Sequence, residues 1–188
     1  MLSQNQHHFL FNSLSAIHDL CTGNSEAQKA LVAFSDYLRV IMFSHHQKKP
    51  VPFEKELKHI KHYLCLEKLR YEERLQVIYD IKATDFKIPL LSVQPIVENA
   101  VSHGLFKKPG GGIIRIRTKE VNEGYIISII DDGVGFDFEA IKESGKSFDS
   151  IEKVRNRLET MCDGTLNISS LPGAGTRVNI KIPKGEAL

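Results

Sequence analysis

The stretch from Pro95 to Gly104 reads P-I-V-E-N-A-V-S-H-G, and the stretch from Asp131 to Gly135 reads D-D-G-V-G. With a helical period, the first places Asn99 and His103 one turn apart on a polar face, opposite Val93, Val97, Ala100 and Val101. The second predicts a strand that ends in a glycine turn. A carboxamide oxygen suits Mg²⁺, and a carboxylate at the end of a buried strand can accept a hydrogen bond from a purine amino group. The two stretches together predict a nucleotide site.

Size and composition restrict the alternatives. A chain of 188 residues that is 41% hydrophobic can bury one core and a small accessory element. Its net charge of +2 gives no bias toward nucleic acid or a membrane surface. The three cysteines, Cys21, Cys65 and Cys162, are widely spaced and favour a reducing cytoplasm over a disulfide framework. We find no apolar run long enough to span a bilayer and no signal peptide, so this chain is not expected to cross a membrane.

The first 45 residues carry two narrow apolar seams at helical spacing. They are Leu10, Leu14, Ile17 and Cys21, followed by Ala27, Leu31, Phe34, Leu38 and Ile41. Gly23 between them suits a left-handed helix end, and Ser25 with Gln28 fits a capping box. Residues 3–45 are therefore predicted to form a helical hairpin. Because two narrow stripes cannot enclose a core, we expect the hairpin to pair with a second copy as a four-helix bundle in a homodimer.

A basic segment with two prolines, residues 45–52, is typical of a linker. Beyond it the pattern predicts a helix from Phe53 to Tyr71, a strand over 75–81, the Pro95 helix, and further strands over 113–118, 125–130, 166–169 and 177–182. The expected fold class is α+β, with helices on one face of a mixed sheet. We place the hairpin domain at residues 1–48 and the second domain at residues 49–188.

His8 lies on the first predicted helix, away from its apolar seam. Relative to the seam of the first helix it lies about 150° away, in line with Asn12, so it is expected to face solvent. A neutral imidazole in that position can attack phosphorus. His59 and His62, three apart on the predicted Phe53–Tyr71 helix, allow a metal pair but bring no further ligands in sequence. Two other residues, Lys107 and Lys108, either reach phosphate oxygens or form a solvated turn, and the turn is slightly favoured.

Five segments, in order, resemble the LytS-type sensor histidine kinases over nearly the whole chain. They are Gln4–Asn12, Glu56–Tyr71, Gln94–Gly104, Asp131–Gly135 and Gly173–Thr176. The resemblance implies that His8 is the phosphoacceptor and that the second domain is an ATP-binding sandwich of the GHKL (Bergerat) type. It further implies that Asn99 ligates Mg²⁺, that Asp131 binds the adenine amino group, and that the remaining pocket residues are Glu98, His103, Gly133, Gly135, Gly175 and Thr176.

The sequence departs from the family pattern at two places. His7 replaces the usual proline before the phosphoacceptor and is a second candidate acceptor, although it lies nearer the seam. The usual Gly-x-Gly-Leu stretch before the Val154–Leu158 segment is absent, so the lid over residues 136–152 is expected to hold triphosphate weakly or to close differently. No general base is evident, and Asn12 is a candidate for orienting the imidazole or a water.

The function implied by the resemblance is Mg-ATP-dependent autophosphorylation of His8, followed by transfer to an aspartate of a response regulator receiver domain. The protein would be the cytoplasmic part of a membrane-anchored bacterial sensor, with any membrane segment lying upstream of Met1. Two alternatives stay open. One is a degenerate, non-catalytic dimer that docks a regulator, which the missing glycines motivate; the other is a GHKL-type Ser/Thr kinase or ATPase, which needs no exposed His8.

Overall fold

The computed structural model describes residues 14, 17–19, 21–44, 47, 49–137 and 149–184. The first long helix, α2 (Ser25–Phe43), follows a turn in which Gly23 has a φ of +93°, as the hairpin prediction requires. The predicted Ser25–Gln28 capping box is wrong: Asn24 is the N-cap, and its side-chain oxygen accepts a hydrogen bond from the Ala27 amide at 3.0 Å. An Asn side chain caps a helix as readily as a Ser side chain does, so α2 starts one residue earlier than the capping box implies.

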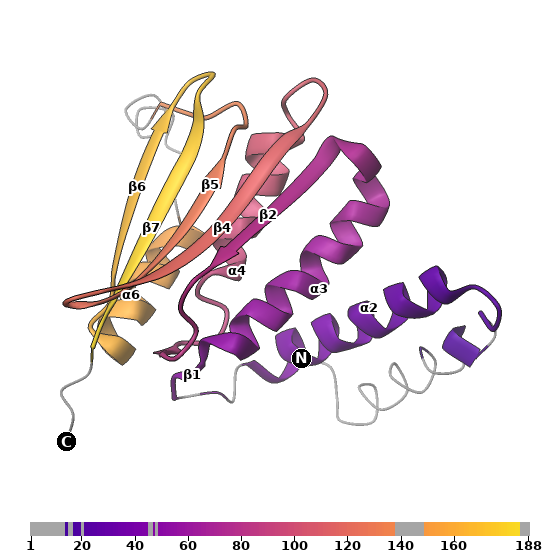
Figure 1. Ribbon diagram of the computed structural model, residues 1–188, viewed down its shortest axis with the longest axis horizontal. Coiled ribbons are helices and arrows are strands. Elements are labelled where there is room, and N and C mark those ends of the chain that lie inside the picture. The colour runs from indigo at the N-terminus through magenta and orange to yellow at the C-terminus, as the bar shows by residue number, and fades with distance from the viewer. Residues whose placement is uncertain are drawn as a thin grey trace.

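The second domain is a five-stranded mixed sheet with helices on one face, as predicted (Figure 1). Its strands are β2 (Leu75–Ile81), β4 (Gly112–Val121), β5 (Gly124–Asp131), β7 (Gly175–Pro183) and β6 (Thr165–Leu171), given in their spatial order. β2 runs parallel to β4, and the other neighbours are antiparallel. The strands alternate between buried and exposed residues, because successive side chains point to opposite faces.

The helices that cover the inner face are α3 (Phe53–Tyr71), α4 (Gln94–Asn99), its π-helical continuation η3 (Ala100–Leu105), and α6 (Asp149–Cys162). A short 3-10 turn, η2 (Glu72–Arg74), connects α3 to β2. The core lies between these helices and the sheet. Its fully buried side chains include Ile60, Leu105, Ile116, Ile127 and Leu158. A single apolar layer therefore fixes the helix that carries Asn99 against the strand that carries Asp131.

The segment predicted as a linker contains a strand. β1 (Val51–Pro52) pairs antiparallel with β3 (Lys87–Ile88) in a small second sheet, and Val51 and Ile88 are both buried. Two prolines made these residues look unstructured, yet β1 has a partner on one side only, and a proline is tolerated in such an edge strand. The boundary at residue 48 falls between the end of α2 and the start of β1 and stays a prediction.

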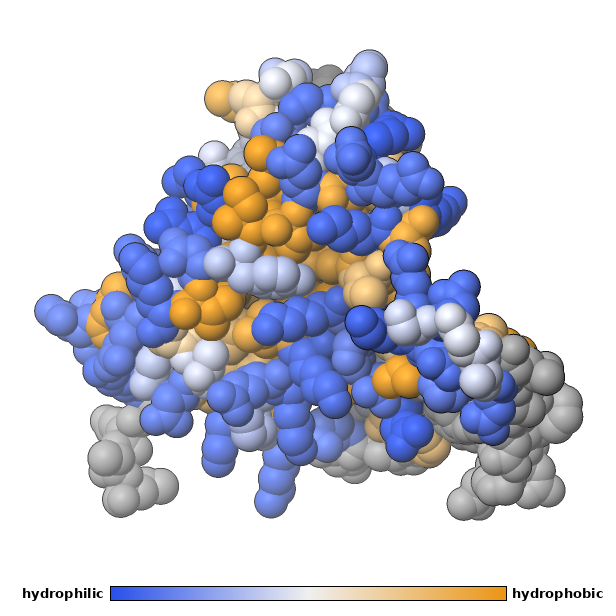
Figure 2. Space-filling model, turned by 45° about the vertical axis from the view of Figure 1, so that its right-hand side comes forward, coloured by the Kyte–Doolittle hydropathy of each residue, from blue (hydrophilic) through white to orange (hydrophobic). Residues whose placement is uncertain are grey.

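Apolar side chains also remain at the surface. Among the large ones with more than a third of their area exposed are Val32, Phe34 and Phe43 on α2 and Ile78 on β2. Figure 2 shows that, on the face it presents, apolar surface gathers near the middle and hydrophilic side chains surround it. Contiguous apolar surface of this kind commonly marks a contact with another molecule.

Candidate nucleotide-binding site

A pocket of about 420 Å³ lies between the α4–η3 helix and the inner face of the sheet. Its walls are mostly apolar, and its polar residues converge from several elements. The lining residues are Ile96, Asn99, Ala100, His103, Gly104, Lys107, Ile129, Asp131, Val134, Gly135, Phe136, Ser150, Ile151, Ile168, Thr176 and Val178. A cavity of this size with apolar walls and a few directed polar groups is typical of a small-molecule site.

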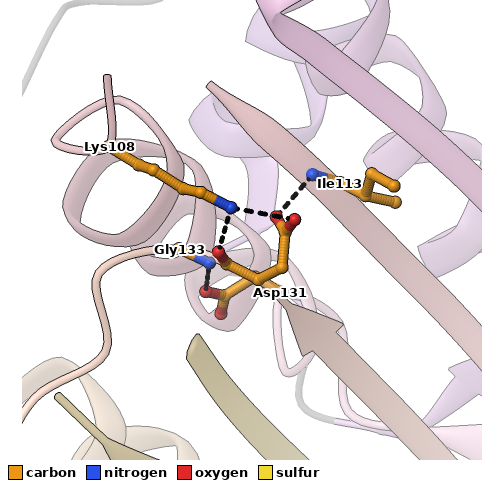
Figure 3. Close-up of polar contacts among 5 residues, drawn as sticks. Lys108, Ile113, Asp131 and Gly133 are labelled. Carbon is orange, nitrogen blue, oxygen red and sulfur yellow. Dashed lines mark hydrogen bonds and ion pairs between the residues drawn. The ribbon is translucent and has the colours of Figure 1, made fainter. Parts of the chain in front are cut away.

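Asp131 is the buried polar group of this pocket, with 5% of its surface exposed. Its Oδ1 accepts a hydrogen bond from the Gly133 amide at 2.9 Å (Figure 3). Burial raises the pKa of Asp131 to about 6, while hydrogen bonds from the backbone of Gly133 and Thr176 act in the opposite direction. A desolvated carboxylate that keeps an acceptor oxygen toward an apolar pocket is suited to bind an amino group on a planar base.

Glycines let the backbone close around Asp131. A Cβ at Gly133 would lie 2.4 Å from the carbonyl carbon of Gly104, and one at Gly175 would lie 2.1 Å from the carbonyl oxygen of Asp131. Gly175 also has a φ of +84°, which side chains disfavour. Gly133 and Gly175 do not line the pocket but hold its base together, whereas Gly135 and Thr176 line it directly.

Asp132, next to Asp131, does not line the pocket and fixes the turn instead. Its Oδ1 accepts the Ile113 amide at 2.7 Å, and its Oδ2 lies 3.0 Å from Lys108 Nζ (Figure 3). Burial acts to raise the pKa of Asp132, but these partners together hold it below its ordinary value. The two lysines lie in a turn, as expected, and Lys107 is exposed there; Lys108 is in addition ion-paired, and Lys107 lines the pocket. The short span from η3 to β4 brings Lys108 to Asp132.

Asn99 and His103, the two polar residues singled out on this helix, both line the pocket. The helix does not keep an α-helical period between them, however, because it becomes a π-helix at Ala100. A π-helical turn is wider than an α-helical turn, so the side chains on it point in other directions than an α-helical period predicts. Ala100, which was expected on the opposite face from Asn99, lines the pocket as well. Val93, Val97 and Val101 are fully buried on the core side, as expected.

The residues at the pocket fit a magnesium ion that arrives with phosphates. The Asn99 side-chain nitrogen lies 3.5 Å from Ser150 Oγ, so this contact does not use the carboxamide oxygen, which is the atom that would bind a cation. Mg²⁺ commonly takes one or two protein oxygens and completes its shell with phosphate and water. Within the described part of the chain, no three His, Cys, Asp or Glu side chains cluster as a metal site of their own. His59 is buried and stacks on Tyr37, with 5.1 Å between the ring centroids.

Glu98 does not line the pocket, although it precedes Asn99. Its Oε1 accepts hydrogen bonds from Tyr37 of α2, at 3.2 Å, and from Gln94. Burial raises the pKa of Tyr37 to about 12, and the charge and hydrogen bond of Glu98 act in the same direction. The structure therefore brings Asn99, His103, Asp131, Gly135 and Thr176 together at the pocket and directs Glu98 toward the hairpin helix.

A second buried carboxylate positions the start of α4. Glu56 is fully buried on α3 and accepts hydrogen bonds from the amides of Leu91, Val93 and Gln94 at 2.7–3.1 Å. Amides at the start of a helix have no acceptor within it, so Glu56 replaces an N-cap across the fold. Arg157 on α6 donates to the Leu91 carbonyl from the other side. At Glu56, therefore, α3 has a structural role.

His8 and Asn12 lie outside the described residues, as do His7 and residues 138–148 of the predicted lid. Sequence reasoning missed the contribution of Ser150 at the start of α6 and of Phe136 after the glycine turn, both of which line the pocket. The signal for Ser150 was present, since a hydroxyl residue near a helix start is a common anion contact.

The fold is an α/β sandwich, and the pocket on the inner face of its sheet contains the buried carboxylate of Asp131. The family model for "Histidine kinase" matches residues 1–75, and the family model for "Histidine kinase-, DNA gyrase B-, and HSP90-like ATPase" matches residues 89–186. The chain belongs to the second family, whose model matches more than half of it, and it is similar to the sensor histidine kinases.

Curated relatives extend over nearly the whole chain. The uncharacterized protein YwpD of Bacillus subtilis is 38% identical over 98% of this chain and 69% of its own length. Sensor histidine kinase YpdA of Escherichia coli is 33% identical, and sensor protein LytS of Staphylococcus saprophyticus is 29% identical. In both cases 94% of this chain is covered, but it spans only 32% of the relative.

Solved structures show the same fold. The histidine kinase domain of the blue-light activated kinase EL346 from Erythrobacter litoralis superposes with a TM-score of 0.55 at 15% identity, covering 94% of this chain and 85% of that one. Histidine kinase AdeS of Acinetobacter baumannii gives a TM-score of 0.55 at 16% identity, covering 99% and 87%. The expected GHKL fold class is thereby confirmed.

The Asp131 carboxyl should titrate with a midpoint near pH 6, well above its ordinary value of 3.8. Because the folded-state pKa is raised, protonated Asp131 stabilises the fold: this contribution is complete below about pH 4 and is lost as the pH rises through about 6. An adenine amino group favours the ionised form, so bound nucleotide should lower the midpoint. Carbon-13 NMR of the side-chain carboxyl measures both values, and a free-protein midpoint at or below about 4 would contradict this description.

Proposed function

We propose that this chain phosphorylates its own His8 with Mg-ATP and passes the phosphoryl group to an aspartate of a response regulator receiver domain. The observation that carries the proposal is the buried Asp131 at the base of an apolar pocket that Asn99 and Lys107 also line. Family membership supports ATP binding and a protein-histidine kinase activity.

In the proposed complex, adenine lies among the apolar walls and donates its amino hydrogen to Asp131. The phosphates lie toward Asn99, Lys107 and Ser150, where the Asn99 oxygen ligates Mg²⁺ and Lys107 offsets negative charge. Gly133 and Gly175 keep Asp131 in place, and Gly135 and Thr176 close the pocket beside it. When bound, Mg²⁺ neutralises charge on the transferring phosphoryl group.

The phosphoryl group is transferred in two displacement steps, first to His8 and then to the regulator. A lone pair of a His8 ring nitrogen forms a bond to the γ-phosphorus, the bond from that phosphorus to the bridging oxygen breaks, and ADP leaves. The phosphorus–nitrogen bond then breaks as a carboxylate oxygen of the regulator attacks. Catalysis of this kind depends mainly on positioning and charge neutralisation, so the two domains must move until His8 and the γ-phosphate are in line.

We further propose that the hairpin forms the homodimer. Phe34 and Ile41, both on the predicted seam of α2, keep 37% and 36% of their area exposed, and Ile17 keeps 45%. Such apolar positions need a covering surface, which a second hairpin supplies in a four-helix bundle. No helix among the described residues qualifies as a membrane span. A cytoplasmic position behind an upstream membrane segment is part of the proposal.

The chemical stability of the product tests the proposed reaction. After incubation of the full chain with γ-labelled ATP and Mg²⁺, the protein-bound label should be lost in acid and retained in base, and EDTA should prevent its appearance. Acid-stable label would indicate a Ser/Thr kinase, and release of free phosphate without labelling would indicate an ATPase. Nucleotide binding without any turnover would indicate the degenerate scaffold. Each of these three outcomes would overturn the proposal.

A further inference from the structure

The face of the sheet opposite the helices carries an ordered pattern of apolar and basic side chains. Figure 1 shows β5 lying between β4 and β7, with α4 and α6 on the other side of the sheet. Since side chains alternate along a strand, the residues of β5 that point away from the core are Ile126, Ser128 and Ile130. Their neighbours Ile127 and Ile129 are buried beneath the helices. The outward residues of β5 therefore form the midline of a face that no helix in the described part of the chain covers.

The strand registers place a cation on each side of both isoleucines. Ile126 lies opposite Lys119 on β4 and opposite Lys181 on β7. Four residues along, Ile130 lies opposite Arg115 on β4 and Arg177 on β7 in the same manner. All four cations are exposed. We call this set of residues, Ile126, Ile130, Arg115, Lys119, Arg177 and Lys181, the basic face.

Acidic groups are scarce on this face. A hollow of about 380 Å³ on it is lined by five cationic residues and by one acidic residue, Asp80. That carboxylate is paired with Arg117 Nε at 2.9 Å. The whole chain has 25 cationic and 23 acidic side chains, so this excess of positive charge is local. A concentrated positive potential attracts an anionic partner.

The shape and composition favour a protein segment over other polyanions. The hollow is concave, with Ser128 hydrogen-bonded to Asn179 at 2.7 Å on its floor, and a planar bilayer cannot follow such a surface. None of the residues that line it is aromatic, so it offers no platform on which nucleic-acid bases could stack. An apolar midline flanked by cations instead complements an amphipathic element with an apolar stripe flanked by acids.

The spacings match an α-helix. β4 and β7 are two strand spacings apart, about 9.6 Å, which is close to the width of a helix of ~10 Å. Ile126 and Ile130 are separated by about 13 Å along the strand, near the ~11 Å between positions i and i+7 of a helix. We infer that the basic face is a docking surface for an acidic amphipathic helix of a partner protein. This inference does not depend on the kinase activity.

A designed peptide tests the inference directly. The probe is a 16-residue helix with leucines at i, i+3, i+4 and i+7 spacing flanked by glutamates, and its control is a scrambled peptide of the same composition. We expect the helix to bind the full chain at low salt. The Lys119→Glu/Lys181→Glu variant should weaken this binding at least tenfold, because it reverses both flanking charges around Ile126.

A matched double variant distinguishes the effect of charge on the basic face from the effect of the net charge of the chain. Lys29→Glu/Lys55→Glu reverses two exposed lysines on α2 and α3 and should change peptide affinity less than twofold. Both double variants should bind an ATP analogue as the parent chain does, which shows that they fold. Equal weakening in both doubles, equal binding of the scrambled peptide, or tighter binding to phosphatidylserine vesicles or to oligo-dT than to the helix would overturn the inference.

Discussion

Asp131→Asn should lower ATP affinity by about 10- to 100-fold while leaving the fold intact. In this variant the side-chain oxygen can still accept the hydrogen bond from the Gly133 amide. The NH₂ group of the asparagine then faces the adenine amino group, and because both groups are donors, no hydrogen bond forms between them. Loss of a hydrogen bond to a charged acceptor costs about 1.5–3 kcal/mol, and about 1.4 kcal/mol is tenfold in affinity. Calorimetric titration with a non-hydrolysable ATP analogue measures this loss.

Base selectivity and a neighbouring carboxylate provide the controls. The parent chain should prefer ATP to GTP, since guanine presents a carbonyl oxygen where adenine has its amino group, and Asp131→Asn should lose that preference. Asp132→Asn changes the adjacent, half-exposed carboxylate that faces Lys108 and should shift ATP affinity less than threefold. Unchanged ATP affinity in Asp131→Asn, or an equal loss in Asp132→Asn, would contradict the assignment.

Gly175→Ala should both destabilise the protein and damage the nucleotide site. Its Cβ would lie 2.1 Å from the Asp131 carbonyl oxygen, so β5 and β7 must separate where Asp131 and Thr176 pair. Such overpacking costs about 1–3 kcal/mol beyond the backbone strain of a side chain at positive φ. We expect nucleotide affinity to fall at least tenfold, measured together with the free energy of unfolding in urea.

Gly173→Ala is a closely matched control in the same turn. Gly173 has a φ of +78°, against +84° for Gly175, but a Cβ there would meet nothing within 4 Å. It should therefore show the backbone strain of about 1–2 kcal/mol without the steric contact, and nucleotide affinity should stay within twofold of the parent. If the two alanine variants lose the same stability and affinity, the close packing against Asp131 does not matter for the site.

Local patterns predicted much of the fold because strands and helices are favoured by residues that are neighbours in sequence. The isoleucine-rich runs 113–118 and 125–130 marked two strands, and Gly23 marked the left-handed turn before α2. Asn99 and Asp131 were singled out because they stand in short motifs, and both line the pocket; their part in nucleotide binding stays a prediction. These features depend on neighbours in sequence, so the sequence alone is enough to find them.

Other features depend on contacts across the fold. The small β1–β3 sheet joins segments that are more than thirty residues apart, and neither strand has enough residues to show a period. Glu98 was grouped with the nucleotide residues, but its orientation depends on Tyr37 of the hairpin, 61 positions earlier. The π-helical turn at Ala100 likewise depends on packing and could not be predicted from an α-helical pattern. The ion pair between Lys108 and Asp132 forms because the end of η3 lies beside the end of β5 in the folded chain.

The position of the phosphate tests the central claim most directly. The full chain and its His8→Ala and His7→Ala variants are incubated with γ-labelled ATP and Mg²⁺, and acid-labile label on the protein is followed with time. We predict that His8→Ala abolishes the label while still binding nucleotide, and that His7→Ala retains it. Full labelling of His8→Ala, or its loss only in His7→Ala, would contradict the account.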